Sequence, residues 1–593
     1  MLKNTAAALR LTHISLFFAG LMWVLPFLHY RHQYPLTTFY QEWWSALLGV
    51  LALGVLAARD YWQQPQVPRI AQLPIVLLGV VLLQWWLGKI VYFDQALLYI
   101  LYLLFAALLM LLGARLRECF GMARLAQVLS VFVLIGAEIS ALLGVLQHFR
   151  WHTPLDPVVV MKISSSVFGN LAQPNHFANY IALGLVSLGL LHRQHRLKAG
   201  YVALLAVPLL FTMTLSGSRS SWLYLLLMSG LAWWWQRRDA GFAGLLRYCL
   251  LLVAGFGAMH LVVQLPFMAG AAGAGADVNT LQRMFGDSAS GSVRLMLWYE
   301  AGTIFMQSPW LGAGLGQFAW QHFQLTPLLY PGAMTGMYNN AHNLVLQLAA
   351  ETGVVGVLAL LGSLGAWLYG LRRAPMDAAH WWGYAATGVL AIHSLLEYPL
   401  WYTYFVAVAA VLLGALDQTR YRLELRNAGR LSVAAMLVLG LMTLVQLRDG
   451  YRQLEQIVRI SPASADAVQR ARDGLVALHG GSLLTPYAEL FMGAMIEVND
   501  EHLREKLDLN TRVMRFIPMN RVVYRQALLL AQDGQQEQAR AVLEQAFWSF
   551  PSELAAVRWL IAGLAEKDPA HFSALLEFAL QKEHEAQRAV HHQ

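Results

Sequence analysis

Two short segments place an arginine where it could bind an anion, at or near the end of an apolar run. In LSGSRSSW, Arg219 is flanked by small residues that permit a tight turn, and in SGSVRLMLWYEAG, Arg294 lies on an expected amphipathic helix. A guanidinium group suits pyrophosphate because its planar fork donates two charge-assisted hydrogen bonds. The alternatives are an Arg219 that reaches lipid headgroups and an Arg294 that is solvated or pairs with Glu300.

A third segment, MYNNAHNLVLQLAAETG, contains a candidate base. His342 opens an apolar run, and a neutral imidazole can take a proton from a hydroxyl group. The alternative is a helix-capping cluster, since Asn343 is a good cap residue. Glu351 lies nine residues after His342, about two and a half helical turns deeper, where it could support the helix entrance or pair internally.

Two further segments carry polar residues at helix boundaries. In HSLLEYPLWYTYF, a proline interrupts the helix and leaves Glu397 and Tyr398 at the end of an apolar run. In GNLAQPNHFANY, Gln173, Asn175 and His176 could bind sugar or position an acceptor, and the alternative is a capped helix start. An ionisable residue at a membrane boundary is costly to bury, so Glu397 is a functional candidate.

The elements that position these residues are expected to cross a membrane. Of 593 residues, 58% are hydrophobic and 13% are charged, which is too few charges for a soluble surface. The chain is basic, but its Arg and Lys residues are spread through short loops between apolar runs, so we expect membrane lipids as partners and no nucleic acid. Apolar runs long enough to span a bilayer occur near 12–30, 41–58, 71–88, 93–113, 125–147, 176–191, 200–215, 221–236, 248–265, 343–371, 381–397, 401–416 and 431–447.

Basic residues are concentrated in every second loop, which predicts the orientation of the chain. The positive-inside rule places these loops and the N-terminus inside, giving an all-α polytopic protein with about 13 spans and an outer C-terminus. The predicted domains are N-terminal spans (1–265), a long outer loop (266–342), C-terminal spans (343–447) and an outer helical domain (448–593). The start of the loop, MAGAAGAGADVNT, should be mobile because small residues bury little surface.

Amphipathic helices are expected in the tail, 448–593. Small residues and turn formers there match the spacing of a tetratricopeptide hairpin, and a generic helical hairpin is the alternative reading. The positions are Tyr524, Ala527, Gly534, Ala539, Ala546 and Pro551, with Pro518 suggesting a preceding repeat.

Taken together and in order, these segments resemble the O-antigen ligase-like superfamily, and more closely the bacterial protein O-oligosaccharyltransferases that glycosylate pilins. The resemblance covers nearly the whole chain, including PLTTFYQEW, SPWLGAGLGQF and the segments quoted above. It implies a bacterial inner-membrane enzyme whose active site and C-terminal domain face the periplasm. It also implies en bloc transfer of an oligosaccharide from undecaprenyl pyrophosphate to a Ser or Thr hydroxyl of a protein such as pilin.

The resemblance further implies roles for individual residues. Arg219 and Arg294 would hold the pyrophosphate, His342 would be the base, and Tyr398 would be a further important residue near it. We expect direct displacement with inversion, because no convincing carboxylate nucleophile occurs among the outer motifs. We expect no cofactor and no metal ion, because the outer loops lack an Asp-x-Asp pair.

Three alternatives remain open at this stage. The same chemistry could serve an O-antigen ligase with lipid A–core as acceptor, or a polymerase of lipid-linked glycans. A lipid-linked oligosaccharide transporter belongs to another class, but transporters place ionisable residues near the bilayer midplane rather than on one face. The third alternative is a scaffold that recruits partners through its helical tail.

Overall fold

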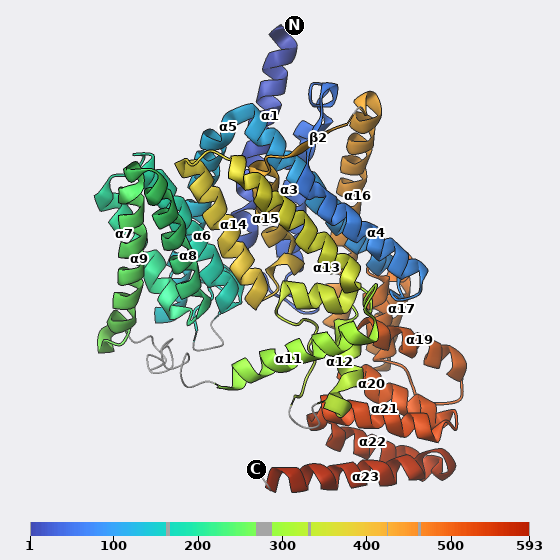
Figure 1. Ribbon diagram of the computed structural model, residues 1–593. Helices are drawn as coiled ribbons and strands as arrows, with labels where there is room; N and C mark the ends of the chain where they lie inside the picture. Colours follow the sequence, from blue (N-terminus) through green and yellow to red (C-terminus); the bar gives the residue numbers. More distant parts are fainter. Residues whose placement is uncertain are drawn as a thin grey trace.

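The computed structural model describes residues 2–161, 166–268, 288–329, 334–423, 425–460 and 464–591. Long helices form a bundle, and a helical tail extends from the end opposite the N-terminus (Figure 1). The stretch 269–280, expected to be mobile, lies outside the described residues.

The first part of the chain supplies helices on both sides of the bundle (Figure 1). Its helices are α1 (Leu2–Met22), α2 (Leu25–Leu28), α3 (Phe39–Ala52), α4 (Gln72–Trp86), α5 (Phe93–Phe149), α6 (Pro174–Arg193), α7 (Ala199–Leu215), α8 (Ser220–Arg238) and α9 (Ala243–Val262). The helix α5 contains a break at Gly121, where φ is 74°. A positive φ is readily adopted by glycine, which has no Cβ, so one continuous segment changes direction there.

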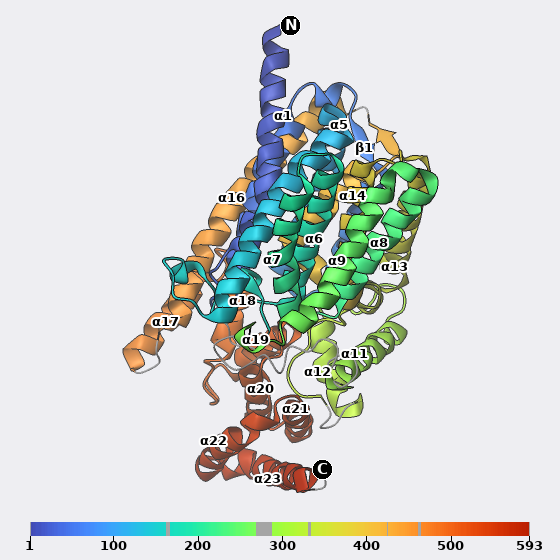
Figure 2. The ribbon, with the colours of Figure 1, turned by 90° about the vertical axis from the view of Figure 1, so that its left-hand side faces the viewer.

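The second part completes the bundle and adds two helices outside it. These elements are α11 (Ser288–Gln307), α12 (Phe318–Leu329), α13 (Leu344–Gly370), α14 (Ala378–Leu396), α15 (Thr403–Leu416) and α16 (Arg426–Val458). The helix α11 lies crosswise to the long helices at the end of the bundle that carries the tail (Figures 1 and 2). A helix that carries Arg294 is therefore present, but its apolar residues lie on both the buried and the exposed face, so the amphipathic pattern is not found.

Each apolar range found in the sequence overlaps one of these helices, and α5 covers two ranges. Within the described residues, seven helices are long and apolar enough to cross a membrane. The all-α membrane class is therefore confirmed, whereas the count of about 13 spans stays a prediction.

Two distant basic loops meet in a short antiparallel sheet that the sequence pattern did not predict. The strands β1 (Gln66–Pro68) and β2 (Arg420–Arg422) pair with Val67 opposite Tyr421. Both loops carry arginines and were assigned to the same side of the membrane, and their pairing requires that they lie on one side.

The tail stacks helical pairs beyond the end of the bundle (Figure 2). Its helices are α17 (Ala465–Leu478), α18 (Thr485–Gly493), α19 (Leu503–Phe516), α20 (Asn520–Gln532), α21 (Gln536–Ser549), α22 (Leu554–Lys567) and α23 (Pro569–His591). The helices α20 and α21 form a hairpin that turns at Gly534 (φ 77°), with Ala527 and Ala539 fully buried. The hairpin is confirmed, and its tetratricopeptide nature stays a prediction. The helix α16 runs continuously through the predicted domain boundary at 447–448.

Candidate active site

A buried carboxylate, Glu397, gathers three predicted site residues from distant parts of the chain. It follows the last residue of α14 and its side chain is 3% exposed. Its Oε1 accepts hydrogen bonds from Asn175 Nδ2 (2.7 Å) and Arg294 Nη2 (2.5 Å), and its Oε2 accepts one from His342 Nδ1 (2.8 Å). The sequence motifs at 169–180, 290–302, 337–353 and 393–405 thus meet at one carboxyl group.

The surrounding charges keep Glu397 ionised. The hydrogen bonds from His342 and Arg294 stabilise the negative charge of this buried carboxylate. A carboxylate only accepts hydrogen bonds, so Nδ1 of His342 must donate. In a neutral imidazole the lone pair is then on Nε2, which is available to accept a proton from a hydroxyl group.

The backbone at His342 is strained, and its ring contacts Glu397. His342 has φ 51°, in the left-handed region that residues with a Cβ adopt at a cost of about 1–2 kcal/mol. The Asn340 side chain accepts a hydrogen bond from the His342 amide (2.8 Å), and Asn343 caps α13 by accepting from the amides of residues 345 and 346. The capping alternative therefore holds for the asparagines, whereas the histidine contacts Glu397 and its role as a base stays a prediction.

Tyr398 packs against the ring of His342, the candidate base. Its ring lies 5.0 Å from that of His342 at 83°, an edge-to-face contact. Burial raises the pKa of Tyr398, so its hydroxyl stays protonated. This arrangement restricts the orientation of the His342 ring.

Behind Tyr398 lies a buried polar chain that the sequence motifs did not reveal. His176 Nδ1 shares a hydrogen bond of 2.9 Å with His393 Nε2, and His393 Nδ1 shares one of 3.2 Å with the Tyr224 hydroxyl. His176 is 2% exposed and His393 is fully buried. A signal for His393 existed, since it is an ionisable residue in an apolar helix one turn before Glu397.

Of the remaining predicted residues, some cap a helix next to the Glu397 cluster and others lie away from it. Gln173 caps α6, because its side chain accepts a hydrogen bond from the His176 amide at 2.5 Å, so the capped-start reading holds there. Glu351 lies away from Glu397 and pairs internally, accepting from the amides of Gly316 (2.9 Å) and Phe318 (3.2 Å). Its backbone also passes so close to Gly312 that a Cβ there would lie 2.2 Å from the Glu351 carbonyl carbon.

Arg219 precedes α8 and does not contact the Glu397 cluster. Among the described residues its side chain has no ion pair or hydrogen bond. The helix that it starts reaches the buried chain through Tyr224, so Arg219 lies at the same end of the bundle. The alternative that Arg294 pairs with Glu300 is wrong, because Arg294 pairs with Glu397 and Glu300 pairs with His322 at 3.0 Å.

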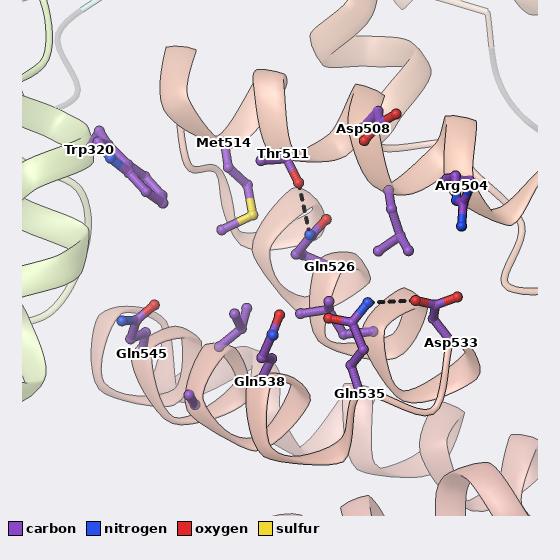
Figure 3. Close-up of a pocket in the computed structure, with 14 residues that line it drawn as sticks. Trp320, Arg504, Asp508, Thr511, Met514, Gln526, Asp533, Gln535, Gln538 and Gln545 are labelled. Atoms are coloured by element: carbon purple, nitrogen blue, oxygen red, sulfur yellow. Dashed lines mark hydrogen bonds between the residues drawn. The ribbon is translucent and has the colours of Figure 1, made fainter. Parts of the chain in front are cut away.

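A cavity of about 600 Å³ lies elsewhere, between α12 and the tail (Figure 3). Trp320 faces the amide side chains of α20 and α21 across it, and Gln526 donates a hydrogen bond to Thr511 at 3.1 Å. It contains none of the predicted site residues.

Comparison with known proteins supports the resemblance stated from the sequence motifs. Residues 204–361 match the O-antigen ligase family, residues 167–192 match a protein glycosylation ligase family, and residues 381–562 match the C-terminal region of a membrane-bound polymerase described as a virulence factor. The ligase-family match contains Arg219, Arg294 and His342.

Two curated relatives come from Acinetobacter baylyi (strain ATCC 33305 / BD413 / ADP1). A general O-oligosaccharyltransferase is 27% identical over 461 residues, covering 75% of this chain and 77% of the relative. A ComP-specific O-oligosaccharyltransferase is 23% identical over 407 residues, covering 68% and 70%. These matches confirm the resemblance seen in the motifs: the chain is similar to O-oligosaccharyltransferases of the O-antigen ligase-like superfamily, which supports a glycosyltransferase-type enzyme.

Proposed function

We propose that the chain transfers an oligosaccharide en bloc from undecaprenyl pyrophosphate to a Ser or Thr hydroxyl of a protein such as pilin. The site faces the periplasmic side of a bacterial inner membrane in this proposal. The observation that carries it is the pair of contacts through which Glu397 holds both the imidazole of His342 and the guanidinium of Arg294.

The reaction needs a base and a stabiliser of the leaving group. His342 Nε2 takes the hydroxyl proton while the acceptor oxygen attacks the anomeric carbon, and the bond from that carbon to the pyrophosphate oxygen breaks. The pyrophosphate leaves with the electron pair, and its charge is stabilised by Arg219 and by the Arg294 donors that do not face Glu397. One displacement inverts the anomeric configuration, and it uses no metal ion in this proposal.

Glu397 acts through its neighbours in this scheme. Its negative charge stabilises the imidazolium that forms when His342 takes the proton, as the carboxylate does in serine hydrolases. It also fixes the direction of Arg294. Asn175 occupies the remaining lone pair of Oε1 and so completes the orientation of the carboxylate.

The proposed topology has about 13 spans, a cytoplasmic N-terminus and a tetratricopeptide-like periplasmic tail. Support comes from the agreement between the apolar ranges and the helices, with α5 divided at Gly121. Opposite ends of the bundle carry the N-terminus and the tail, as an odd number of spans requires (Figure 1).

Reconstitution tests the function. The purified chain in vesicles receives a lipid-linked oligosaccharide and a candidate pilin, with and without a chelator. We expect glycan on a pilin Ser or Thr in both arms, and we expect the anomeric configuration of the new linkage to be inverted relative to that of the lipid-linked donor. Requirement for a divalent cation would contradict the proposed chemistry.

A second acceptor class is favoured by the match of residues 204–361 to the O-antigen ligase family. The same vesicles therefore receive lipid A–core, and a further arm receives the lipid-linked glycan alone. Transfer only to lipid A–core would assign a ligase, and elongation of the lipid-linked glycan alone would assign a polymerase. Movement of the lipid across the bilayer without any transfer would assign a transporter.

A further inference from the structure

The helix α11 has one face that no part of the described chain covers. Leu295, Tyr299 and Met306 are 64%, 65% and 75% exposed, and Trp310, just after the helix, is 74% exposed. Spacings of four and seven residues place the three helical positions on one side of α11. A soluble surface would not leave so much contiguous apolar area in water.

The opposite face of α11 packs against the protein. Leu297, Ala301 and Ile304 are buried in a cluster with residues of α12 and α13. The two charged residues between 293 and 310 are Arg294 and Glu300, and both make inward ion pairs, with Glu397 and His322. The outward face therefore carries no charge at all in this stretch.

The end of α11 is fastened to a helix that is long and apolar enough to cross a membrane. The amide of Val354 in α13 donates to the Pro309 carbonyl at 2.8 Å, beside the bend of α13 at Gly353. Beyond this contact, α13 exposes Leu358 (64%) and Leu361 (51%), as a lipid-facing helix does. The apolar face of α11 thus continues into a lipid-facing surface through Trp310.

We propose that the outward face of α11 lies in the lipid at the membrane surface, so that the bilayer holds Arg294 against Glu397. The crosswise position of α11 relative to the long helices is the orientation of a helix in the membrane plane (Figures 1 and 2). Tyr299 and Trp310 are the residue types that settle at the boundary between headgroups and acyl chains. Leu295 and Met306 insert beside them.

Spin labels test the placement independently of enzymatic activity. Cys119 is exposed and is replaced by serine, whereas Cys249 is buried and can stay. Single cysteines are introduced at Leu295, Met306, Leu361 and Trp559, and the labelled full chain is placed in nanodiscs of phosphatidylethanolamine and phosphatidylglycerol. Trp559 is a matched water control, because it is 70% exposed in α22, a tail helix far from the bundle (Figure 2).

Oxygen should enhance the relaxation of the labels at 295 and 306 more than a water-soluble nickel complex does. The label at 361, on the lipid-facing helix α13, should behave in the same way. The label at 559 should respond mainly to the nickel complex. Nickel access at 295 and 306 equal to that at 559 would overturn the proposal. Protection from both reagents would also overturn it, because a second copy or an acceptor protein would then cover the face.

A pair of substitutions tests the coupling to Arg294, and this arm rests on the proposed transfer. Met306→Glu should lower the rate of transfer in vesicles roughly fivefold or more, because a charged side chain is costly to place in lipid. Met306→Leu should keep the rate of the parent chain. Both variants should keep the thermal unfolding midpoint of the parent chain. Equal transfer by the two variants would remove the coupling and leave the spin-label result standing.

Discussion

Two buried glutamates in this molecule have almost the same partners and different surroundings. Glu397 binds an arginine, a histidine and an asparagine, whereas Glu489 in α18 binds Arg512, His479 and the Tyr92 hydroxyl. Both carboxylates are nearly inaccessible, at 3% and 6% exposure. A set of donors around a carboxylate therefore does not by itself distinguish a reaction site from a structural contact between two parts of the chain, which we call a joint when it is centred on Glu489.

The two clusters differ in which ring nitrogen of the histidine binds the carboxylate and which one stays free. His479 uses Nε2, the ring nitrogen farther from the backbone, to bind Glu489 at 2.9 Å, whereas His342 binds with Nδ1 and leaves Nε2. The Tyr92 hydroxyl donates to Glu489 at 2.6 Å, which ties the start of α5 to the tail. The Glu397 cluster instead borders the buried histidine chain, at the end of the bundle where Arg219 precedes α8.

The largest difference between the two clusters is expected for their histidines. His342→Ala should reduce transfer by about 10²–10⁴-fold because it removes the base. His479→Ala should change transfer less than twofold. Both rates are measured in vesicles with matched protein amounts. Comparable losses in the two variants would show that the joint takes part in the reaction.

The arginines should separate activity from stability. Arg219→Ala should lower transfer by about 10–100-fold without changing the unfolding midpoint, since the side chain has no partner among the described residues. Arg512→Ala should keep transfer and lower stability by up to about 1 kcal/mol, because the Arg512 side chain is 45% exposed and Glu489 keeps its hydrogen bonds with Tyr92 and His479.

Thermal unfolding and initial rates measure both properties of the arginine variants. Arg540→Ala, in the tail and without an ion pair in the described part of the chain, controls for loss of positive charge. A lower unfolding midpoint in Arg219→Ala, matching its loss of rate, would contradict a binding role.

Lowering the pH should destabilise the joint around Glu489, and Glu489→Gln should reduce the dependence of stability on pH. Burial raises the pKa of Glu489, but hydrogen bonds from Tyr92, His479 and Arg512 bring the pKa below the ordinary 4.5. A lowered pKa in the folded state gives stability that is complete above the unfolded-state value and is lost as the pH falls through the folded-state value. Unfolding midpoints between pH 3 and 6 should therefore fall less steeply in the variant, and identical slopes would exclude this contribution.

The smallest effect is expected at a cap. Asn343→Ala should cost about 1 kcal/mol of stability, because it removes the side chain that accepts from two amides at the start of α13. Transfer should fall only modestly, since the Asn340 contact still shapes the turn at His342. Asn343→Asp keeps an acceptor and should restore the midpoint. A loss of transfer in Asn343→Ala as large as that of His342→Ala would move Asn343 from a cap to the reaction itself.

The site could be predicted as far as its motifs were local. His342 and Glu397 each stood at a helix boundary, where an ionisable residue is unusual, and Arg294 stood on an expected helix of the outer loop. The structure brings all three together. Glu351 stood in a similar pattern but binds the turn at Gly316, which local spacing could not distinguish. His393 and Tyr224 were missed because their pairing depends on the packing of α8 against α14.

The sequence by itself determined the helical membrane class and the residue types available for transfer, because hydropathy and helix boundaries are local properties of the chain. It could not determine which carboxylate orients His342, nor that α11 turns Arg294 inward and an apolar face outward. Those features depend on contacts between residues as far apart as 175 and 397. Such contacts exist only after the helices have packed, since hydrogen bonds over that separation are a product of tertiary structure.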